Sequence, residues 1–270
     1  MEDFSYQKPK TVDDAREAYS ASADGLFLAG GQTILPVMKL GLAAPSAVID
    51  LGGIEGLRAI LVTDSVVSIG AMATHATVAA SGDVRQAIPA LSDLAGMIGD
   101  PQVRTRGTIG GSIANNDPAA DYPAAVLALN ATITTDKRQI AADDFFVAMF
   151  ETALEEGEII TNVEFPVADA AAYAKFANPA SRFALAGVFV ARTGNSVRVA
   201  VTGAGTCVFR VADMEAALAK DFSATALDGI TVATENLNTD IHASAEYRGH
   251  LIGVMAKRAV EAAQTKGGGK

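Results

Sequence analysis

Residues 106–121 decide the fold that we expect, and they read RGTIGGSIANNDPAAD. The stretch has the glycines of a phosphate-binding loop, yet it matches neither the G-x-G-x-x-G dinucleotide fingerprint nor the G-x-x-x-x-G-K-S/T phosphate loop. Glycine lets the backbone approach a ligand closely, and successive backbone N–H groups in such turns bind anions without a basic side chain. A candidate phosphate site therefore comprises Thr108, Ile109, Gly110, Gly111 and Ser112.

A second glycine pair lies in AGGQT, residues 29–33, directly after the apolar run Leu26–Ala29, which we expect to be a buried strand. Taken alone, each pair is equally well explained by turn formation. Together they offer donors for a pyrophosphate, and Asp121 offers a carboxylate that accepts hydrogen bonds from ribityl or ribose hydroxyls. The two glycine pairs therefore predict one diphosphate site.

Other motifs have plainer interpretations. Asp117 and Asp121 are four residues apart, so a shared metal ion is an alternative, but Pro118 between them favours helix N-capping. The segment GAGTCV, residues 203–208, lacks the third glycine and the acidic ribose ligand of a dinucleotide site, so we expect a strand-to-helix loop. The histidines have no metal-ligand spacing and are expected to be structural or exposed: His75, His242 and His250.

The composition excludes several classes of protein. Half of the 270 residues are hydrophobic, and the mean hydropathy of +0.25 is that of a globular chain. No apolar run approaches the roughly 20 residues of a spanning helix, and the N-terminus MEDFSYQKPK lacks the apolar core of a signal peptide, so we expect a cytoplasmic protein. The net charge of -10 opposes nucleic-acid binding. The one cysteine, Cys207, cannot ligate an iron–sulfur cluster, so redox chemistry requires an organic cofactor or a partner's metals.

We expect three units and a short tail. An α/β unit ends near residue 55, a second α/β unit covers residues 56–166, and an α+β unit covers residues 167–266, followed by a flexible tail at residues 267–270. In the first unit, Thr11 caps a helix that runs to Ala21.

The later units have clear element patterns of their own. The second unit contains a hairpin over residues 58–71 and a helix over about 83–98, which Asp100-Pro101 ends before the glycine-rich loop. The third unit contains two strands over residues 184–202, joined by the turn Thr193-Gly194-Asn195, and helices over 211–220 and 245–266.

Two long stretches carry a resemblance to a known family. Ala29–Leu40, AGGQTILPVMKL, and Asp100–Leu129, DPQVRTRGTIGGSIANNDPAADYPAAVLAL, closely resemble the FAD-binding medium subunit of the molybdenum hydroxylases, the carbon monoxide dehydrogenase and xanthine dehydrogenase group. Gly157–Pro166, Lys175–Val190 and Ala245–Ala263 fit the same family, so the likeness spans nearly the whole chain.

The resemblance implies a fold, a cofactor and partners. The fold would be of the α+β class: two α/β subdomains of the vanillyl-alcohol-oxidase (PCMH-type) FAD-binding fold clasping FAD, plus a C-terminal domain with a small antiparallel sheet and helices. A large molybdopterin subunit would oxidise the substrate, and a small subunit with two 2Fe–2S clusters would pass the electrons to the FAD and on to an external acceptor. Two such heterotrimers would pair.

The resemblance also implies roles for individual residues. Asp117 and Asp121 would belong to the cofactor site, with Asp121 bonded to a ribityl or ribose hydroxyl. Ile98 and Ile160 would pack on the flavin or adenine. Lys175 would lie near the flavin pyrimidine edge, where a cation stabilises negative charge that develops on reduction. The backbone N–H groups of Thr108–Ser112 would wrap the diphosphate, and so would Leu28, Ala29, Gly30, Gly31, Gln32, Thr33 and Ile34.

Three positions depart from the carbon monoxide enzymes. Phe183 stands where those enzymes have a tyrosine near the isoalloxazine, and phenylalanine stacks but does not hydrogen-bond. Gln32 and Ser112 replace a histidine and an asparagine of some relatives. These departures argue against carbon monoxide as the substrate.

Two other interpretations stay open. One is a free-standing FAD-dependent oxidase of the same nucleotide-binding fold, although the roughly 100 residues after Pro166 hold few polar side chains suited to acid–base work. The other is a nucleotide-binding regulatory module without redox function. In the leading interpretation the substrate pocket lies in another polypeptide, so this chain names neither the substrate nor the terminal acceptor.

Overall fold

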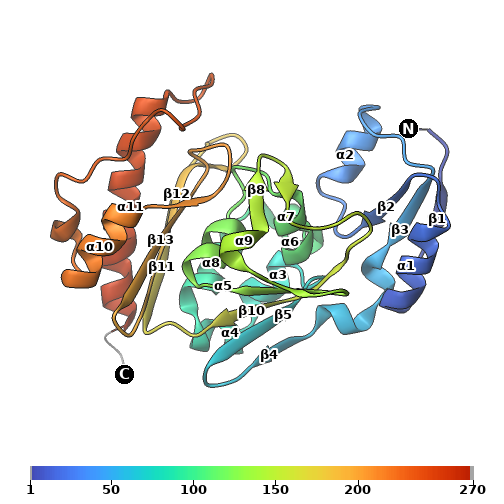
Figure 1. The fold of residues 1–270 in the computed structure, drawn as a ribbon, viewed down its shortest axis with the longest axis horizontal. Coiled ribbons are helices and arrows are strands. Elements are labelled where there is room, and N and C mark those ends of the chain that lie inside the picture. Colours follow the sequence, from blue (N-terminus) through green and yellow to red (C-terminus); the bar gives the residue numbers. More distant parts are fainter. Residues whose placement is uncertain (1, 268–270) are drawn as a thin grey trace.

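The computed structural model describes residues 2–267 and has a mixed α/β fold (Figure 1). The helices are α1 (Val12–Ser20), α2 (Ile34–Lys39), α3 (His75–Ala80), α4 (Gly82–Ala87), α5 (Pro89–Gly96), α6 (Pro101–Arg106), α7 (Ile109–Asn115), α8 (Tyr122–Ala128), α9 (Ala142–Phe145), α10 (Ala212–Lys220) and α11 (Ala245–Gly267). The strands are β1 (Ser5–Gln7), β2 (Gly25–Leu28), β3 (Ala47–Asp50), β4 (Ile60–Val62), β5 (Val66–Gly70), β6 (Thr132–Thr135), β7 (Gln139–Ala141), β8 (Phe146–Ala148), β9 (Glu151–Thr152), β10 (Ile160–Pro166), β11 (Ala170–Ala177), β12 (Ala184–Thr193), β13 (Ser196–Thr202) and β14 (Phe209–Arg210).

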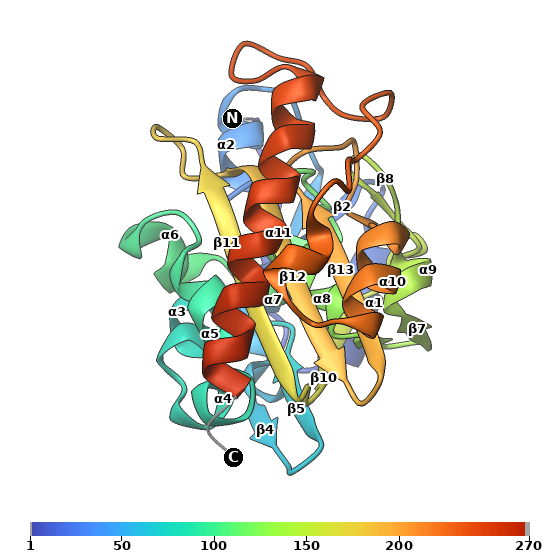
Figure 2. The same ribbon diagram turned by 90° about the vertical axis from the view of Figure 1, so that its left-hand side faces the viewer.

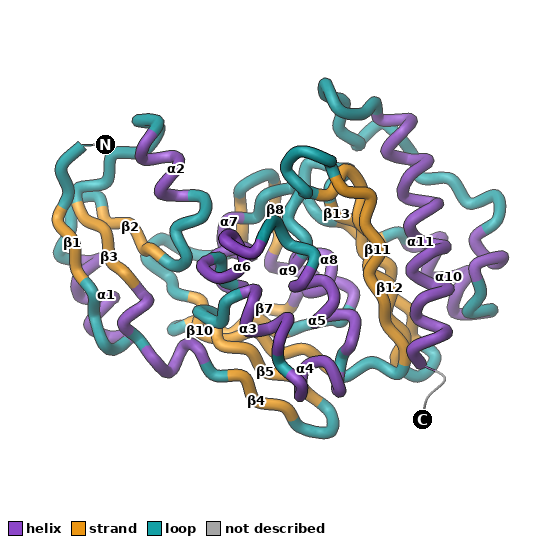
Figure 3. The backbone as a smooth tube through the Cα atoms, turned by 180° about the vertical axis from the view of Figure 1, so that it is seen from behind, coloured by secondary structure: helices purple, strands orange, loops and turns teal. Residues whose placement is uncertain are grey.

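A parallel three-stranded sheet forms one end of the molecule, with strand order β1-β3-β2 (Figures 1 and 3). Helix α1 connects β1 to β2, and its Thr11 cap is confirmed, because the Asp14 N–H donates to Thr11 Oγ1 at 3.1 Å. Ala15 and Ile49 are fully buried between helix and sheet. The expected buried strand before this turn is only partly buried, because β2 is at the edge of the sheet and Leu28 is its one buried residue. The polypeptide leaves β2 directly into the turn at residues 29–33, which therefore lies at the carboxyl end of this parallel strand.

The central layer is an antiparallel five-stranded sheet in the order β4-β5-β10-β6-β7. The expected hairpin over residues 58–71 is confirmed as β4 and β5, with Ile60 opposite Ile69. Helices α3, α5, α7 and α8 share the largest hydrophobic core with this sheet. That core contains fully buried residues from both layers, among them Ile69, Leu91, Ile113 and Phe165.

A second antiparallel sheet, β11-β12-β13-β14, lies at the other end of the molecule. Figure 2 shows α11 lying across this sheet with α10 beside it. The opposite face of the sheet packs on α5 and α8 of the central layer. Residues 184–191 of β12 are all buried, as their continuous apolar run predicts for a strand covered on both faces.

The prediction of one continuous helix over residues 83–98 is wrong. The segment forms two helices, α4 and α5, separated at Ile88, whose φ of -137° and ψ of 79° are not helical. Pro89 causes the break, because it lacks an N–H and disfavours a helical residue before it, but it begins α5 readily.

The long polar loop expected after Asp100-Pro101 is also wrong, because the segment contains α6 and α7. Asp100 begins α6, with its Oδ1 accepting from the Val103 N–H at 2.9 Å. Thr108 caps α7 in the same way, accepting from the Gly111 N–H at 3.1 Å. The capping residues outweigh the glycines in setting the local structure.

The C-terminal end of the chain differs slightly from the expectation. Helix α11 runs through Gly267, so the expected tail at 267–270 begins inside a helix, and residues 268–270 lie outside the described residues. Within residues 2–267, no helix combines the length and the apolar character that crossing a membrane requires.

Candidate functional site

The two glycine turns of the sequence are in direct contact. A Cβ atom on Gly30 would lie 2.1 Å from the carbonyl oxygen of Arg106 and 2.8 Å from the Cα of Gly107. A Cβ on Gly111 would lie 3.4 Å from the Cβ of Ala29. Backbone atoms cannot move aside as a flexible side chain can, so only glycine fits at position 30 without separating the turns. The fold thus joins residues that are about 80 positions apart into one surface.

The first turn presents unpaired backbone donors. Gly31 has a φ of +74°, a left-handed conformation that glycine adopts without strain and that reverses the chain between β2 and α2. Within residues 2–267, the N–H groups of four consecutive residues have no hydrogen-bond partner: Gly30, Gly31, Gln32 and Thr33. A run of free N–H groups on a turn that begins with two glycines is a site for an anion.

The second turn differs from the expectation that its N–H groups wrap a diphosphate. The N–H groups of Ile109 and Gly110 donate to the carbonyl oxygens of Ala73 and Ala71, at 3.1 and 2.9 Å. Those of Gly111 and Ser112 donate to Thr108 Oγ1 and to the Thr108 carbonyl, as expected for a capped helix. Of residues 108–112, only Thr108 has an N–H without a partner among the described residues, so most of the free donors come from residues 30–33.

A buried charge cluster lies at the start of α8. The ammonium of Lys175 is 3.0 Å from Oδ1 and 3.1 Å from Oδ2 of Asp121, and both side chains are 4% exposed. The hydroxyl of Tyr173 donates to Asp121 Oδ1 at 2.5 Å. Burial raises the pKa of Asp121, while the Lys175 charge and the hydrogen bonds from Tyr173 and Lys175 act to lower it.

Hydrogen bonds from the end of β13 fix the loop that precedes Asp121. The Thr202 hydroxyl at the end of β13 donates to the carbonyl oxygens of Ala120, at 2.6 Å, and Pro118, at 3.0 Å. Asp117 accepts from the Ala119 N–H at 2.8 Å and so closes a local turn.

The helix N-capping expected of these carboxylates is wrong for Asp121, which is at the N-cap position of α8 but accepts no helix N–H because Lys175 and Tyr173 occupy its carboxylate. Among the described residues, no group of three or more His, Cys, Asp or Glu side chains is placed to hold a metal.

Lys175 also gathers the residues expected near the flavin. Its ammonium donates to the Met97 carbonyl and to the Arg182 carbonyl, both at 3.0 Å. Ile98 and Phe183 are the next residues along the chain from those two. Phe183 is 48% exposed and available to a ligand, whereas Ile160 is 6% exposed within the central core.

A buried histidine connects the two ends of the site. The backbone N–H of His75 donates to the Gly107 carbonyl at 2.9 Å. The centroid of the His75 ring is 5.4 Å from that of Tyr122, the residue after Asp121. Burial, with a smaller contribution from the Arg104 charge, lowers the pKa of His75 to about 4, so the ring is neutral at neutral pH. Among the described residues, His75 Nδ1 and Tyr122 Oη are buried without a partner.

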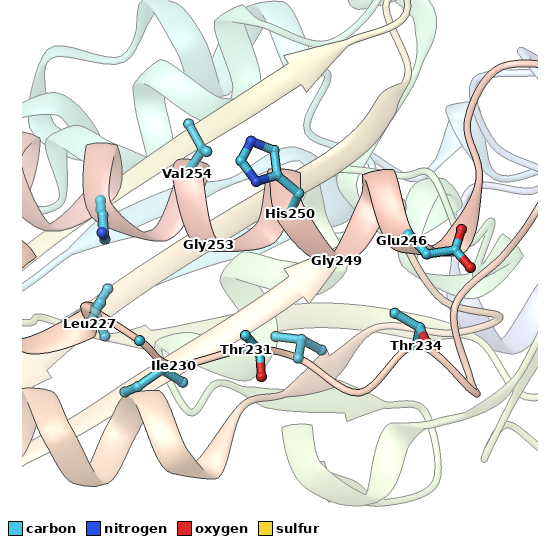
Figure 4. A pocket seen from close by; sticks show the side chains of 12 residues that line it. Leu227, Ile230, Thr231, Thr234, Glu246, Gly249, His250, Gly253 and Val254 are labelled. Carbon is cyan, nitrogen blue, oxygen red and sulfur yellow. The ribbon is translucent and has the colours of Figure 1, made fainter.

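A cleft of about 450 Å³ lies elsewhere, between α11 and residues 227–234 (Figure 4). Gly249, His250 and Gly253 of α11 line one wall, and Leu227, Ile230 and Thr231 line the other. No residue of the glycine turns or of the charge cluster lines it. The cleft is therefore separate from the candidate site.

Comparison with known proteins agrees with this geometry. Residues 2–168 match the family described as the FAD binding domain in molybdopterin dehydrogenase, and this range contains both glycine turns and Asp121. The chain belongs to this family. It is accordingly a flavoprotein subunit of an oxidoreductase.

Relatives of the same family match the chain over nearly its full length. The nicotine 6-hydroxylase medium subunit of Paenarthrobacter nicotinovorans is 38% identical, over 94% of this chain and 95% of the relative. The carbon monoxide dehydrogenase medium chain of Hydrogenophaga pseudoflava is 35% identical, over 96% of each chain. Among solved structures, reconstituted carbon monoxide dehydrogenase from Oligotropha carboxidovorans matches with a TM-score of 0.87 at 31% identity, covering 98% of both chains. Quinoline 2-oxidoreductase from Pseudomonas putida 86 matches with a TM-score of 0.87 at 28% identity, also over 98% of both.

Sequence reasoning about this FAD-binding chain missed Tyr173 and Gly187. Tyr173 is two positions before Lys175, so the two side chains share one face of β11, but that strand was not expected. Gly187 is a glycine inside an apolar strand, a pattern that marks close approach of another group. These two signals were present, although neither identifies Asp121 as the partner.

Proposed function

We propose that the chain is the FAD-binding subunit of a heterotrimeric molybdenum hydroxylase and relays electrons from an iron–sulfur subunit through FAD to an external acceptor. The observation that carries the proposal is the contact between the two glycine turns, which places the unpaired N–H groups of residues 30–33 beside the second turn. The printed names of the relatives, medium subunits and medium chains of hydroxylases and dehydrogenases, support the assignment to a multi-subunit enzyme.

The residues present fit the cofactor. The free N–H groups of residues 30–33 would bind the diphosphate oxygens, and Gly111 would let the ligand approach the second turn. Asp121 would accept a hydrogen bond from a hydroxyl of the ribityl or ribose group, and Lys175 with Phe183 would face the flavin. The FAD supplies the acceptance and release of electrons, while the chain binds it, excludes water and provides charge.

The proposal extends to organisation and partners. We propose unit boundaries near residues 55 and 166, because no sheet crosses either boundary. The first segment holds β1–β3, the second holds the five-stranded sheet and the β8-β9 pair, and the third holds β11–β14. The partners would be a small subunit with 2Fe–2S clusters and a large molybdopterin subunit, in a dimer of heterotrimers. Cys207 is the sole cysteine, so iron–sulfur clusters would reside on a partner.

The direct test is FAD binding by a variant of the second turn. A valine at Gly111 would project toward Thr108 Oγ1 and Ala29 Cβ, which are 2.9 and 3.4 Å from the first added atom. We expect Gly111→Val to abolish FAD retention while far-UV circular dichroism still reports a folded chain. Gly56→Ala is the matched control, because nothing lies within 4 Å of the added Cβ there. Full flavin content in Gly111→Val would contradict the assignment.

A further inference from the structure

Among the described residues, the Tyr173 hydroxyl is the one uncharged side-chain group that hydrogen-bonds to the carboxylate of Asp121. Tyr173 is 8% exposed and donates to Asp121 Oδ1 at 2.5 Å. It lies on β11, two residues before Lys175. Its ring stacks on that of Phe189 in the adjacent strand, with the ring centroids 6.1 Å apart. The ring position is thus fixed by the sheet, and the hydroxyl is aimed at Asp121.

The sheet leaves a space for this hydroxyl at Gly187. In the register of β11 and β12, Gly187 is opposite Lys175. A Cβ on Gly187 would lie 2.3 Å from Tyr173 Oη and 2.9 Å from Tyr173 Cζ. Any other residue at position 187 would displace the tyrosine hydroxyl, so the glycine and the tyrosine act as a matched pair.

The hydrogen-bond donors of the cluster are all engaged, whereas the Asp121 carboxylate keeps free acceptor sites. An ionised carboxylate has about four lone-pair sites. On Asp121, Oδ1 accepts from Tyr173 and Oδ2 accepts from Lys175, whose ammonium also lies 3.0 Å from Oδ1 as an ion pair. One lone-pair site therefore remains on each oxygen. The three ammonium protons of Lys175 are directed to Asp121 and to the carbonyl oxygens of Met97 and Arg182.

We propose that Tyr173 is a positioning residue of the flavin site. Its hydrogen bond fixes the orientation of the Asp121 carboxylate and leaves one free acceptor site on each oxygen for a cofactor hydroxyl. It also draws off part of the negative charge that otherwise offsets Lys175 beside the flavin. This inference rests on the proposed FAD function. Loss of the hydroxyl therefore weakens FAD binding and makes the bound flavin harder to reduce, because a flavin gains negative charge on reduction.

The test uses the full chain reconstituted with FAD, comparing wild type with Tyr173→Phe. We measure the FAD dissociation constant by fluorescence titration and the midpoint potential by equilibration with a reference dye. A hydrogen bond to a charged group is strong, so we expect the dissociation constant to rise about tenfold. We also expect the midpoint potential to fall.

Tyr122→Phe is the matched control. It removes a buried hydroxyl from the residue next to Asp121, but that hydroxyl has no hydrogen-bond partner among the described residues. Both the FAD affinity and the potential should stay at the wild-type values. Gly187→Ala is the second variant, because it keeps the tyrosine but displaces its hydroxyl, and it should lower the potential as Tyr173→Phe does.

The outcomes separate this inference from the proposed function. If Tyr173→Phe lowers the melting temperature of the FAD-free chain but leaves the affinity and the potential unchanged, Tyr173 is merely structural and the inference fails. If the wild-type chain does not bind FAD at all, the proposed function itself fails. A lower potential in both variants of the pair, with Tyr122→Phe unchanged, establishes the positioning role.

Discussion

Lys175→Met tests the buried charge cluster most sharply. Methionine keeps much of the apolar stem of lysine but removes the ammonium that lies 3.0 Å from Asp121. The variant leaves Asp121 in a 4% exposed position with Tyr173 as its remaining hydrogen-bond donor. It also leaves the carbonyl oxygens of Met97 and Arg182 without this donor. A buried carboxylate without its cation is therefore the main consequence.

The magnitude follows from the burial of the pair. Removing one partner of a buried ion pair costs about 3–5 kcal/mol in the free energy of unfolding, because the other charge is left uncompensated. The double variant Asp121→Asn with Lys175→Met removes both charges, and we expect it to recover about half of that loss. The recovery is the signature that distinguishes an uncompensated charge from lost packing.

The loss in Lys175→Met should also depend on pH. The ordinary pKa of the carboxyl group is 3.8, burial raises the pKa of Asp121, and loss of the lysine raises it further. A group whose pKa is higher in the folded state destabilises the fold as the pH rises from 3.8 through the folded pKa. The deficit relative to wild type is therefore smallest below about pH 4 and complete at high pH.

Urea unfolding followed by far-UV circular dichroism measures this deficit, since the chain has no tryptophan. We expect the deficit at pH 8 to exceed the deficit at pH 4. Stability within about 1 kcal/mol of wild type at both pH values would refute the interpretation of Asp121 and Lys175 as a buried, mutually compensating pair.

Two further titrations test other parts of the structure. Burial alone would raise the pKa of Glu158, but hydrogen bonds from Arg138, the Glu155 N–H and Thr135 hold it at about 2. The ionised Glu158 therefore contributes to the free energy of unfolding above pH 4.5, and this contribution declines as the pH falls toward 2, by about 1–2 kcal/mol between pH 7 and 3. Glu158→Gln should be less stable than wild type at pH 7, and its stability should depend less on pH in this range. The pKa of about 4 at His75 means that the unfolded chain binds a proton that the folded chain does not. Stability should fall by about 2 kcal/mol from pH 7 to pH 5, and His75→Phe should remove that fall in thermal unfolding.

Much of the architecture followed from local patterns. The Thr11 cap and the turn Thr193-Gly194-Asn195 are short-range signals that depend on only a few neighbouring residues, and both correspond to the structure, with Gly194 at a φ of +57°. The break at Pro89 was missed because the apolar residues keep a helical spacing across it, and periodicity alone does not register the missing N–H.

Strand β11 could not be recognised from its own residues. Its sequence, AAAYAKFA, is rich in alanine, which favours helices in isolation. It becomes a strand because β12 pairs with it along its length and α11 covers it. The sheet context overrides the intrinsic preference.

The candidate site was partly predictable for a similar reason. The glycine turns were visible in the sequence because each is a local motif. The structure shows that they touch at Gly30 and Arg106, while their role in one cofactor site stays a prediction. The link between Tyr173 and Asp121 was not visible, because it joins residues 52 positions apart and depends on the register of β11. Which turn offers the free donors also required the structure, since Thr108 caps its own helix.

Hydrogen–deuterium exchange with and without FAD shows whether the backbone N–H groups of residues 30–33 bind the cofactor. In the free chain, the N–H groups of Gly30, Gly31, Gln32 and Thr33 have no partner among the described residues, so they should exchange fast. If these N–H groups bind the diphosphate, one equivalent of FAD should slow exchange in a peptide covering residues 28–34, while α10 is unaffected. If FAD binds and this peptide still exchanges at the rate of the free chain, the diphosphate is not bound by these N–H groups.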